Sequence, residues 1–182
     1  MRIVGGTFKG RSLFEFNGLE VRPTADKTRE SLFNIIKERT MGAEFLDLFC
    51  GTGAVGIEAL SRGAKSVSFN DISKNSITLA QKNLTKVDKE GVAKIGVNVF
   101  FTTLSAKTFI TNSTKKYDVV FIDAPYSSLS GEEALFGAES LLKDGGIVVF
   151  ESENKLQDEY NGLKKYDERK YGRAYLTFFS KE

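Results

Sequence analysis

The residues best suited to hold a ligand lie in a glycine-rich stretch, residues 45–56. An apolar run, Phe45-Leu-Asp-Leu-Phe-Cys50, is interrupted by Gly51 and Gly53 and followed by apolar residues at helical spacing. This pattern predicts a strand, a tight turn and a helix. Glycines let a backbone approach a ligand closely, and the N–H groups at a helix N-terminus can donate hydrogen bonds to it.

The residue that decides between ligands for this turn is Asp47. The spacing Gly51-x-Gly53-x-x-Gly56 matches the fingerprint of dinucleotide-binding proteins. Asp47, however, lies near the end of the predicted strand, where a carboxylate repels a pyrophosphate and attracts a cation. S-adenosylmethionine carries an amino group and a sulfonium centre, so it suits this turn better than NAD. The alternative is a buried strand–helix turn beside a solvated aspartate.

Three aspartates, Asp47, Asp71 and Asp123, come at the ends of predicted strands. Strand and helix patterns alternate over residues 44–151, which predicts a parallel sheet covered by helices on both faces. In such a sheet the ligand lies outside the carboxyl ends of the strands. Asp71 follows Gly51 by about 20 residues, the spacing at which a carboxylate reaches a ribose diol. Each aspartate alone fits a solvated strand end, but the ordered set is more specific for a ligand site.

A second group of functional side chains follows the strand that ends at Asp123, in the turn Asp123-Ala124-Pro125-Tyr126. The Asp123 carboxylate and the Ala124 carbonyl are acceptors beside the ring of Tyr126. This set suits a planar group that bears an exocyclic amine, because the acceptors bind the amine while the ring stacks. Pro125 has no N–H and fixes the turn. The alternative is a plain strand-to-loop turn with a half-buried tyrosine.

Composition excludes several kinds of chemistry. The 182 residues contain no histidine and one cysteine. A histidine triad, a histidine base, a histidine-ligated metal and a cysteine-rich zinc site are therefore ruled out, and we expect no metal. The single cysteine allows no internal disulfide and fits a reducing compartment. No signal peptide and no apolar run of about 18 residues is seen, so we expect a cytoplasmic protein that does not span a membrane.

The patterns predict one domain, residues 1–182, with an N-terminal extension (1–23) and an α/β core (24–182). Within the extension, residues 2–4 and 12–16 predict a hairpin. The core is expected to contain helices over residues 24–39, 54–62, 73–86, 105–110 and 132–142, and strands over 45–50, 66–71, 97–101, 117–123, 147–151, 163–170 and 174–179. The last two strands have no helix between them, which predicts an antiparallel hairpin.

Basic residues are concentrated near the N-terminus. Residues 1–40 hold eight Lys/Arg and five Asp/Glu, a net charge of +3, whereas the rest of the chain is at −1. This asymmetry indicates a polyanionic partner such as RNA, although a solvated surface with a chance excess of charge is an alternative. The candidate RNA-binding residues are Arg2, Lys9, Arg11, Arg22, Lys27 and Arg29.

At this point the chain resembles a known family. The Asp-Ala-Pro-Tyr turn is similar to the Asp/Asn-Pro-Pro-Tyr/Phe motif of amino-group methyltransferases. Further segments resemble the RsmD family, the bacterial 16S rRNA guanine-N2 methyltransferases: Arg2-Ile3-Val4-Gly5-Gly6, Gly10-Arg11, Arg22-Pro23-Thr24, Arg29-Glu30-Ser31-Leu32-Phe33-Asn34 and Glu151-Ser152-Glu153. The resemblance implies a Rossmann-like class I S-adenosylmethionine-dependent methyltransferase with a seven-strand, mostly parallel sheet, an antiparallel last strand and an N-terminal β-hairpin.

The resemblance also implies roles for individual residues. Asp47, Gly51 and Gly53 would hold the methionine end of S-adenosylmethionine, and Asp71 its ribose. Two residues depart from the family pattern. Ala124 replaces a proline but keeps the backbone carbonyl, and Ser105 stands where an acidic or Asn side chain more often faces the adenine amine. Ser105-Ala106 would then bind adenine more weakly or through the backbone.

Residues of the Asp123-Ala124-Pro125-Tyr126 turn would hold a flipped-out guanine for in-line methyl transfer to its N2 amine. The expected partner is 16S rRNA, within an assembling small ribosomal subunit, and the expected state is a monomer. Three alternatives stay open: an adenine-N6 methyltransferase acting on DNA or RNA, an NAD-dependent oxidoreductase, and a non-catalytic RNA-binding module of the same fold.

Overall fold

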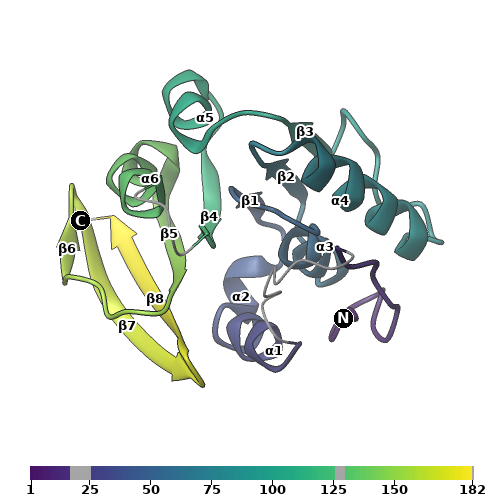
Figure 1. The fold of residues 1–182 in the computed structure, drawn as a ribbon, viewed down its shortest axis with the longest axis horizontal. Helices are drawn as coiled ribbons and strands as arrows, with labels where there is room; N and C mark the ends of the chain where they lie inside the picture. The colour runs from purple at the N-terminus through teal and green to yellow at the C-terminus, as the bar shows by residue number, and fades with distance from the viewer. Residues whose placement is uncertain (17–25, 126–129, 182) are drawn as a thin grey trace.

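A twisted β-sheet with helices on both faces forms the core (Figure 1). The computed structural model describes residues 1–16, 26–125 and 130–181. In these residues the strand order is β3-β2-β1-β4-β5-β8-β7-β6. The strands are β1 (Glu44–Asp47), β2 (Ser66–Asn70), β3 (Val99–Thr102), β4 (Tyr117–Ile122), β5 (Leu142–Ser152), β6 (Glu159–Tyr160), β7 (Leu163–Tyr171) and β8 (Ala174–Lys181).

Strand directions confirm the predicted Rossmann-like methyltransferase sheet. β1 to β5 are parallel, and β8 is antiparallel to both β5 and β7. The expected seven strands are therefore present, and the two-residue β6 adds a short antiparallel edge beside β7. The final hairpin, β7–β8, also forms as predicted.

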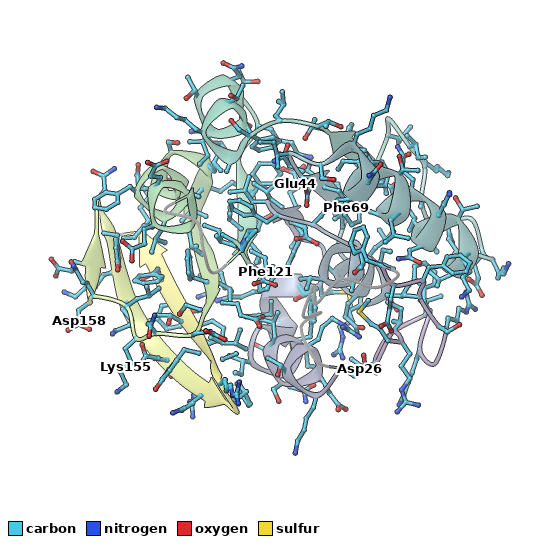
Figure 2. All side chains as sticks on the ribbon, viewed as in Figure 1. Asp26, Glu44, Phe69, Phe121, Lys155 and Asp158 are labelled. Carbon is cyan, nitrogen blue, oxygen red and sulfur yellow. The ribbon has the colours of Figure 1, made fainter. Side chains whose placement is uncertain are left out.

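The helices divide between the two faces of the sheet. They are α1 (Asp26–Ile35), α2 (Lys37–Thr40), α3 (Ala54–Ser61), α4 (Lys74–Val87), α5 (Ala106–Asn112), α6 (Ser130–Ala138) and the 3-10 turn η1 (Glu139–Leu141). One buried cluster joins α1, α3 and α4 to side chains of the sheet such as Phe69 and Phe121. The other joins α5 and α6 to the opposite face, through residues such as Val120 and Leu135. Figure 2 shows Phe69 and Phe121 inside the molecule and Asp158 at its edge.

Continuous apolar runs in the sequence result from this two-sided burial. Along β4, Val119 and Phe121 belong to one cluster, whereas Val120 and Ile122 belong to the other. Successive strand residues point to opposite faces, so a strand covered on both sides needs apolar residues at every position.

Several predicted boundaries differ from the observed ones: the strand expected over residues 45–50 ends at Asp47, and larger differences lie around β5. The helix expected over residues 132–142 ends at Ala138, and β5 begins at Leu142 rather than at Ile147. The Asp144-Gly145-Gly146 segment lies within β5, where pairing with β4 shifts register and Gly145 has a φ of +74°. Glycine tolerates this conformation, so the segment forms an irregularity in the strand rather than a helix end. The helix expected over residues 24–39 is interrupted at Ile36, between α1 and α2.

The predicted N-terminal hairpin is present as a short antiparallel pairing. Arg2 and Ser12 form a β-bridge, and the Ile3 N–H donates to the Arg11 carbonyl at 2.9 Å. Its turn packs against α3 so tightly that a Cβ on Gly6 would lie 1.8 Å from the Ser61 carbonyl oxygen. The hairpin is therefore packed onto the core rather than projecting from it.

Among the residues described, none of the helices combines the length and the apolar character needed to cross a membrane.

Candidate active site

Strand register brings the three aspartates to one edge of the sheet. Asp47, the last residue of β1, lies opposite Phe69 of β2 and Phe121 of β4. Asp71 and Asp123 each follow these partners by two residues, so they flank β1 at the carboxyl edge. Two strand spacings separate them, about 10 Å. The edge between them is where an open α/β sheet binds ligands.

Asp47 is buried against the start of α3. Its side chain accepts a hydrogen bond from the Gly56 N–H at 2.9 Å, and the residue is 1% exposed. The carboxylate therefore lies at the helix N-terminus, where a nucleotide phosphate would otherwise bind. Burial, and to a smaller extent the charge of Asp71, raise the pKa of Asp47 to about 7, against the lowering effect of the Gly56 N–H. An occupied anion site argues against a dinucleotide.

The three glycines of the turn have different roles. Gly51 has a φ of +50°, and a Cβ added there would meet no atom within 4 Å. A Cβ on Gly53 would come within 2.8 Å of the Ala80 Cβ, and one on Gly56 within 2.3 Å of the Phe69 ring. Gly53 and Gly56 thus allow close packing, whereas Gly51 borders open space at the carboxyl edge.

Asp71 is fixed by two backbone donors. One oxygen accepts the Gly51 N–H at 2.9 Å and the other accepts the Ser73 N–H at 2.8 Å. These bonds join the Gly51 turn to the end of β2 and leave further lone pairs on both oxygens for a diol. The next residue, Ile72, is 73% exposed despite its apolar side chain. Sequence analysis did not identify Ile72 as a candidate site residue. The feature that could have indicated it is an apolar residue directly after an acidic strand end.

Buried amides hold the edge together, and sequence analysis also missed them. Asn70 donates to the carbonyls of Leu48 (3.1 Å) and Leu104 (3.0 Å), which connects the chain after β1 with the chain after β3. Asn83 of α4 donates to the Thr52 carbonyl at 2.9 Å and exchanges two hydrogen bonds with the Phe14 backbone. The glycine turn is thereby joined to the N-terminal hairpin.

The structure describes part of the Asp123-Ala124-Pro125-Tyr126 turn. Asp123 is half-buried, Ala124 is buried and Pro125 is exposed, whereas Tyr126 lies outside the described residues. Asp123 and Pro125 each have an interaction partner. Ala124 packs beside α6, where a Cβ on Gly131 would come within 3.0 Å of the Ala124 Cβ. The small side chain at position 124 thus fits a close approach between the turn and the helix.

Ser105 uses its side chain to begin α5. Its Oγ accepts the Thr108 N–H at 3.1 Å and lies 2.8 Å from the Thr108 Oγ1. This is an N-cap arrangement, which aims the hydroxyl at its own helix. Ala106 is buried behind it. The Ser105 hydroxyl is therefore engaged at the start of α5, and Ala106 has no polar side-chain atom.

One predicted RNA-binding residue, Arg29, is corrected by the structure. Its side chain is fully buried, 3.0 Å from Asp26 and 3.5 Å from Glu58, and it donates to the Arg2 carbonyl. Arg62 also binds Glu58, with its Nε 2.7 Å from the carboxylate. Arg29 therefore joins the hairpin to α1 and α3, and its guanidinium does not face solvent where RNA could bind.

The other basic candidates differ in exposure. Lys9 and Lys27 are exposed, and Arg2 has an exposed side chain 3.8 Å from Asp26. Arg11 forms an ion pair with Glu90 and donates to the Val87 carbonyl at the end of α4. Arg22 lies outside the described residues. The basic character of the N-terminus is thus partly used within the fold.

A pocket of about 250 Å³ lies away from the three aspartates. Its lining includes Arg39, Asp118 and Gly145. Asp118 is near the start of β4, so the pocket lies at the amino edge of the sheet, opposite the three aspartates. It is not part of the candidate site.

Comparison with known proteins gives the family. Residues 1–180 match the family model described as "Conserved hypothetical protein 95". The "Ribosomal RNA small subunit methyltransferase D" of Escherichia coli strain K12 is 34% identical over 90% of this chain and 77% of its own. The protein of that name from Haemophilus influenzae is 32% identical over 84% and 79%.

A solved structure agrees with this assignment. The "Putative methyltransferase yhhF from Escherichia coli" is 29% identical and superposes with a TM-score of 0.85 over all of this chain and 98% of its own. The match covers the N-terminal hairpin as well as the sheet. The chain therefore belongs to the RsmD family of methyltransferases.

Proposed function

We propose that the protein methylates the exocyclic N2 amine of a guanine in 16S rRNA, with S-adenosylmethionine as methyl donor. The observation that carries this proposal is the buried Asp47 carboxylate on the Gly56 N–H, at a turn where Gly51 borders open space. An acidic group at this position selects a cationic ligand over a phosphate. The substrate is the rRNA of an assembling small subunit, and the protein acts as a cytoplasmic monomer with a single catalytic domain, residues 1–182.

The described residues fit the cofactor. Asp47 and the turn at Gly51 and Gly53 accommodate the methionine end, Asp71 accepts hydrogen bonds from the ribose hydroxyls, and the backbone of Ser105-Ala106 faces the adenine. Bound S-adenosylmethionine supplies an activated methyl group. The protein contributes position, because a fixed carboxylate such as Asp71 orients the ligand before reaction.

The turn at Asp123 holds the target base. The guanine amine is a poor nucleophile because its lone pair is delocalised into the ring. Asp123 and the Ala124 carbonyl accept hydrogen bonds from the amine and stabilise the positive charge that develops on it. Pro125 keeps the turn rigid, and Tyr126 stacks on the base. No covalent intermediate is required, and burial raises the pKa of the one cysteine, Cys50, which disfavours its thiolate.

The names of the relatives favour this function over adenine-N6 methylation of DNA. Those cited above are named for methylation of ribosomal RNA of the small subunit. The Asp-Ala-Pro-Tyr turn alone fits either exocyclic amine.

Two measurements test the proposal. Calorimetry should detect binding of S-adenosylmethionine but not of NAD. Methyl transfer from labelled S-adenosylmethionine should reach undermethylated 16S rRNA or assembling small subunits but not DNA, with the label on guanine N2 after nucleoside digestion. Saturable NAD binding without S-adenosylmethionine binding, or label on adenine N6, would overturn it.

A further inference from the structure

The basic N-terminal region, residues 1–40, offers fewer RNA contacts than its composition indicates. Arg29 is buried, and Arg11 is bound to Glu90. The hairpin turn also packs on Ser61, the last residue of α3. Since α3 starts at the carboxyl edge and is eight residues long, this contact lies about 12 Å along the helix from the glycine turn. Fewer N-terminal cations are thus available to RNA than the sequence indicates.

A second basic segment lies at the opposite end of the chain. Residues 169–175 read Arg-Lys-Tyr-Gly-Arg-Ala-Tyr, with three basic residues, two flanking aromatic rings and no acid. They form the end of β7, the turn at Gly172 and the start of β8. Figure 1 shows this hairpin running past the ends of β4 and β5, with its tip at the bottom of the view. Basic residues interleaved with aromatics are typical of single-stranded RNA binding.

The sheet register places this tip beside the catalytic turn. Ile122 pairs with Phe150, so Asp123, the next residue, is level with Glu151. Glu151 pairs with Leu176, and Leu176 pairs with Arg169. Arg169 is thus three strand spacings from Asp123, about 14 Å. Residues 170–174 extend further beyond the carboxyl edge, within reach of nucleotides next to a base held at Asp123.

Two side chains of the tip lie on the face of the sheet that α6 covers. Lys170 pairs with Tyr175, and its Nζ lies 5.1 Å from the centre of the Tyr175 ring. Tyr175 in turn pairs with Ser152, two residues after Phe150. Phe150 belongs to the cluster under α6, the helix that follows the catalytic turn. Alternation along β5 therefore puts Ser152, Tyr175 and Lys170 on the α6 face.

The charges available at the tip belong to Lys170 and Arg173. Arg169 forms an ion pair with Asp167 at 3.0 Å, so part of its charge is used within β7. Lys170 and Arg173 are exposed, and a Cβ added at Gly172 between them would meet no atom within 4 Å. Both cations can therefore reach a phosphate without breaking an ion pair within residues 169–175.

We propose that Lys170, Arg173 and Tyr175, here called the β7–β8 tip, bind the RNA strand next to the flipped guanine. Lys170 and Arg173 contact its phosphates, and Tyr175 stacks on a neighbouring base. This inference rests on the proposed function, since it deepens the assignment of RNA as the partner. It predicts that the tip contributes to RNA affinity and not to cofactor affinity.

The test compares K170A/R173A with a control, K94A/K164A, that removes two exposed lysines away from the tip. Undermethylated 16S rRNA is the probe. Loss of two phosphate contacts should lower the slope of log affinity against log salt by about 1.4 and raise KM for RNA. The single-turnover rate at saturating RNA and the affinity for S-adenosylhomocysteine should stay as in the unaltered protein, and the control should match it throughout.

Tyr175 is tested separately. Y175L should weaken RNA binding by about 5- to 150-fold, whereas Y175F keeps the ring and should bind normally. An unchanged salt slope in K170A/R173A, or an equal change in the lysine control, would overturn the inference, as would equal binding by Y175L and Y175F. Methylation of RNA by the unaltered protein is measured in the same series. Its absence would overturn the proposed function as well.

Discussion

At the scale of single residues, Asp47 is a buried carboxylate whose protonation links folding to pH. Burial raises its pKa from 3.8 to about 7, so the folded state binds a proton more tightly than the unfolded chain does. Its contribution to stability is therefore present in full below pH 4 and is lost as the pH rises to about 7. A pKa shift of about three units corresponds to at most about 4 kcal/mol of folding free energy.

The first prediction follows from this linkage. Asp47→Asn keeps an acceptor for the Gly56 N–H but has no charge to bury, so it should unfold at higher urea concentration than the unaltered protein at pH 8 and gain less at pH 5. In the unaltered protein, affinity for S-adenosylmethionine should rise between pH 6 and 8 as Asp47 ionises. Asp47→Asn should not show this rise. Urea titrations and calorimetry at both pH values measure these effects. Parallel pH profiles for the two proteins would contradict the prediction.

Asp123 gives a second prediction at this scale. Asp123→Asn replaces an acceptor with a donor that faces the hydrogens of the target amine. Methyl transfer in a single turnover should fall by about 10²–10³-fold, or about 3–4 kcal/mol, while affinity for S-adenosylhomocysteine changes little. Asp118→Asn is the control, because Asp118 lies near the other end of β4 and binds Lys143. Near-normal turnover in Asp123→Asn would leave Asp123 with a structural role.

At the scale of elements, the glycine turn combines ligand contact with packing. Gly51 borders open space, whereas a Cβ on Gly56 would collide with Phe69 across the contact between α3 and β2. The same substitution at these two positions should therefore separate binding from stability.

Gly51→Ala should cost about 1–2 kcal/mol of folding stability through its left-handed backbone and should reduce cofactor affinity more strongly. Gly56→Ala should lower stability by about 1–3 kcal/mol through overpacking. Its cofactor affinity, measured below the melting temperature, should be affected less. Thermal unfolding and calorimetry on both variants give the comparison. A larger loss of cofactor affinity in Gly56→Ala than in Gly51→Ala would reverse the assignment.

At the scale of the whole molecule, a buried charge cluster holds the N-terminal extension to the core. Glu58 accepts the Val4 N–H at 2.8 Å and pairs with Arg29 and Arg62. Arg29 in turn donates to the Arg2 carbonyl. The cluster joins the hairpin, α1 and α3, so removal of one charge leaves its partner buried without full compensation.

Arg29→Met should therefore lower the free energy of unfolding by about 3–5 kcal/mol, as measured in urea. Lys27→Met, two residues away and exposed, should change it by less than about 0.5 kcal/mol. If Arg29 instead bound RNA, its substitution would weaken RNA binding and leave the free energy of unfolding unchanged. That result would restore the interpretation drawn from the sequence.

Local chain chemistry was sufficient to predict the parallel sheet, the glycine turn and the strand-end positions of Asp47, Asp71 and Asp123. Apolar runs and glycines determine backbone conformation over a few residues, and strands of one parallel sheet end at one edge. The specific Arg-Pro-Thr and Arg-Glu-Ser-Leu-Phe-Asn segments gave the family. These features depend on neighbours along the chain, which a sequence displays directly.

Tertiary structure alone decided what each charged side chain faces. Arg29 and Arg11 read as RNA contacts in the sequence, yet their partners Glu58 and Glu90 are 29 and 79 residues away. Asp47 became a buried helix cap only once α3 packed against β1. The β7–β8 tip shares the carboxyl edge with Asp123, about 14 Å away, only through the pairing of β4 with β5, β5 with β8 and β8 with β7. Burial and charge pairing are properties of contacts between distant segments, so the periodicity of a single segment does not specify them.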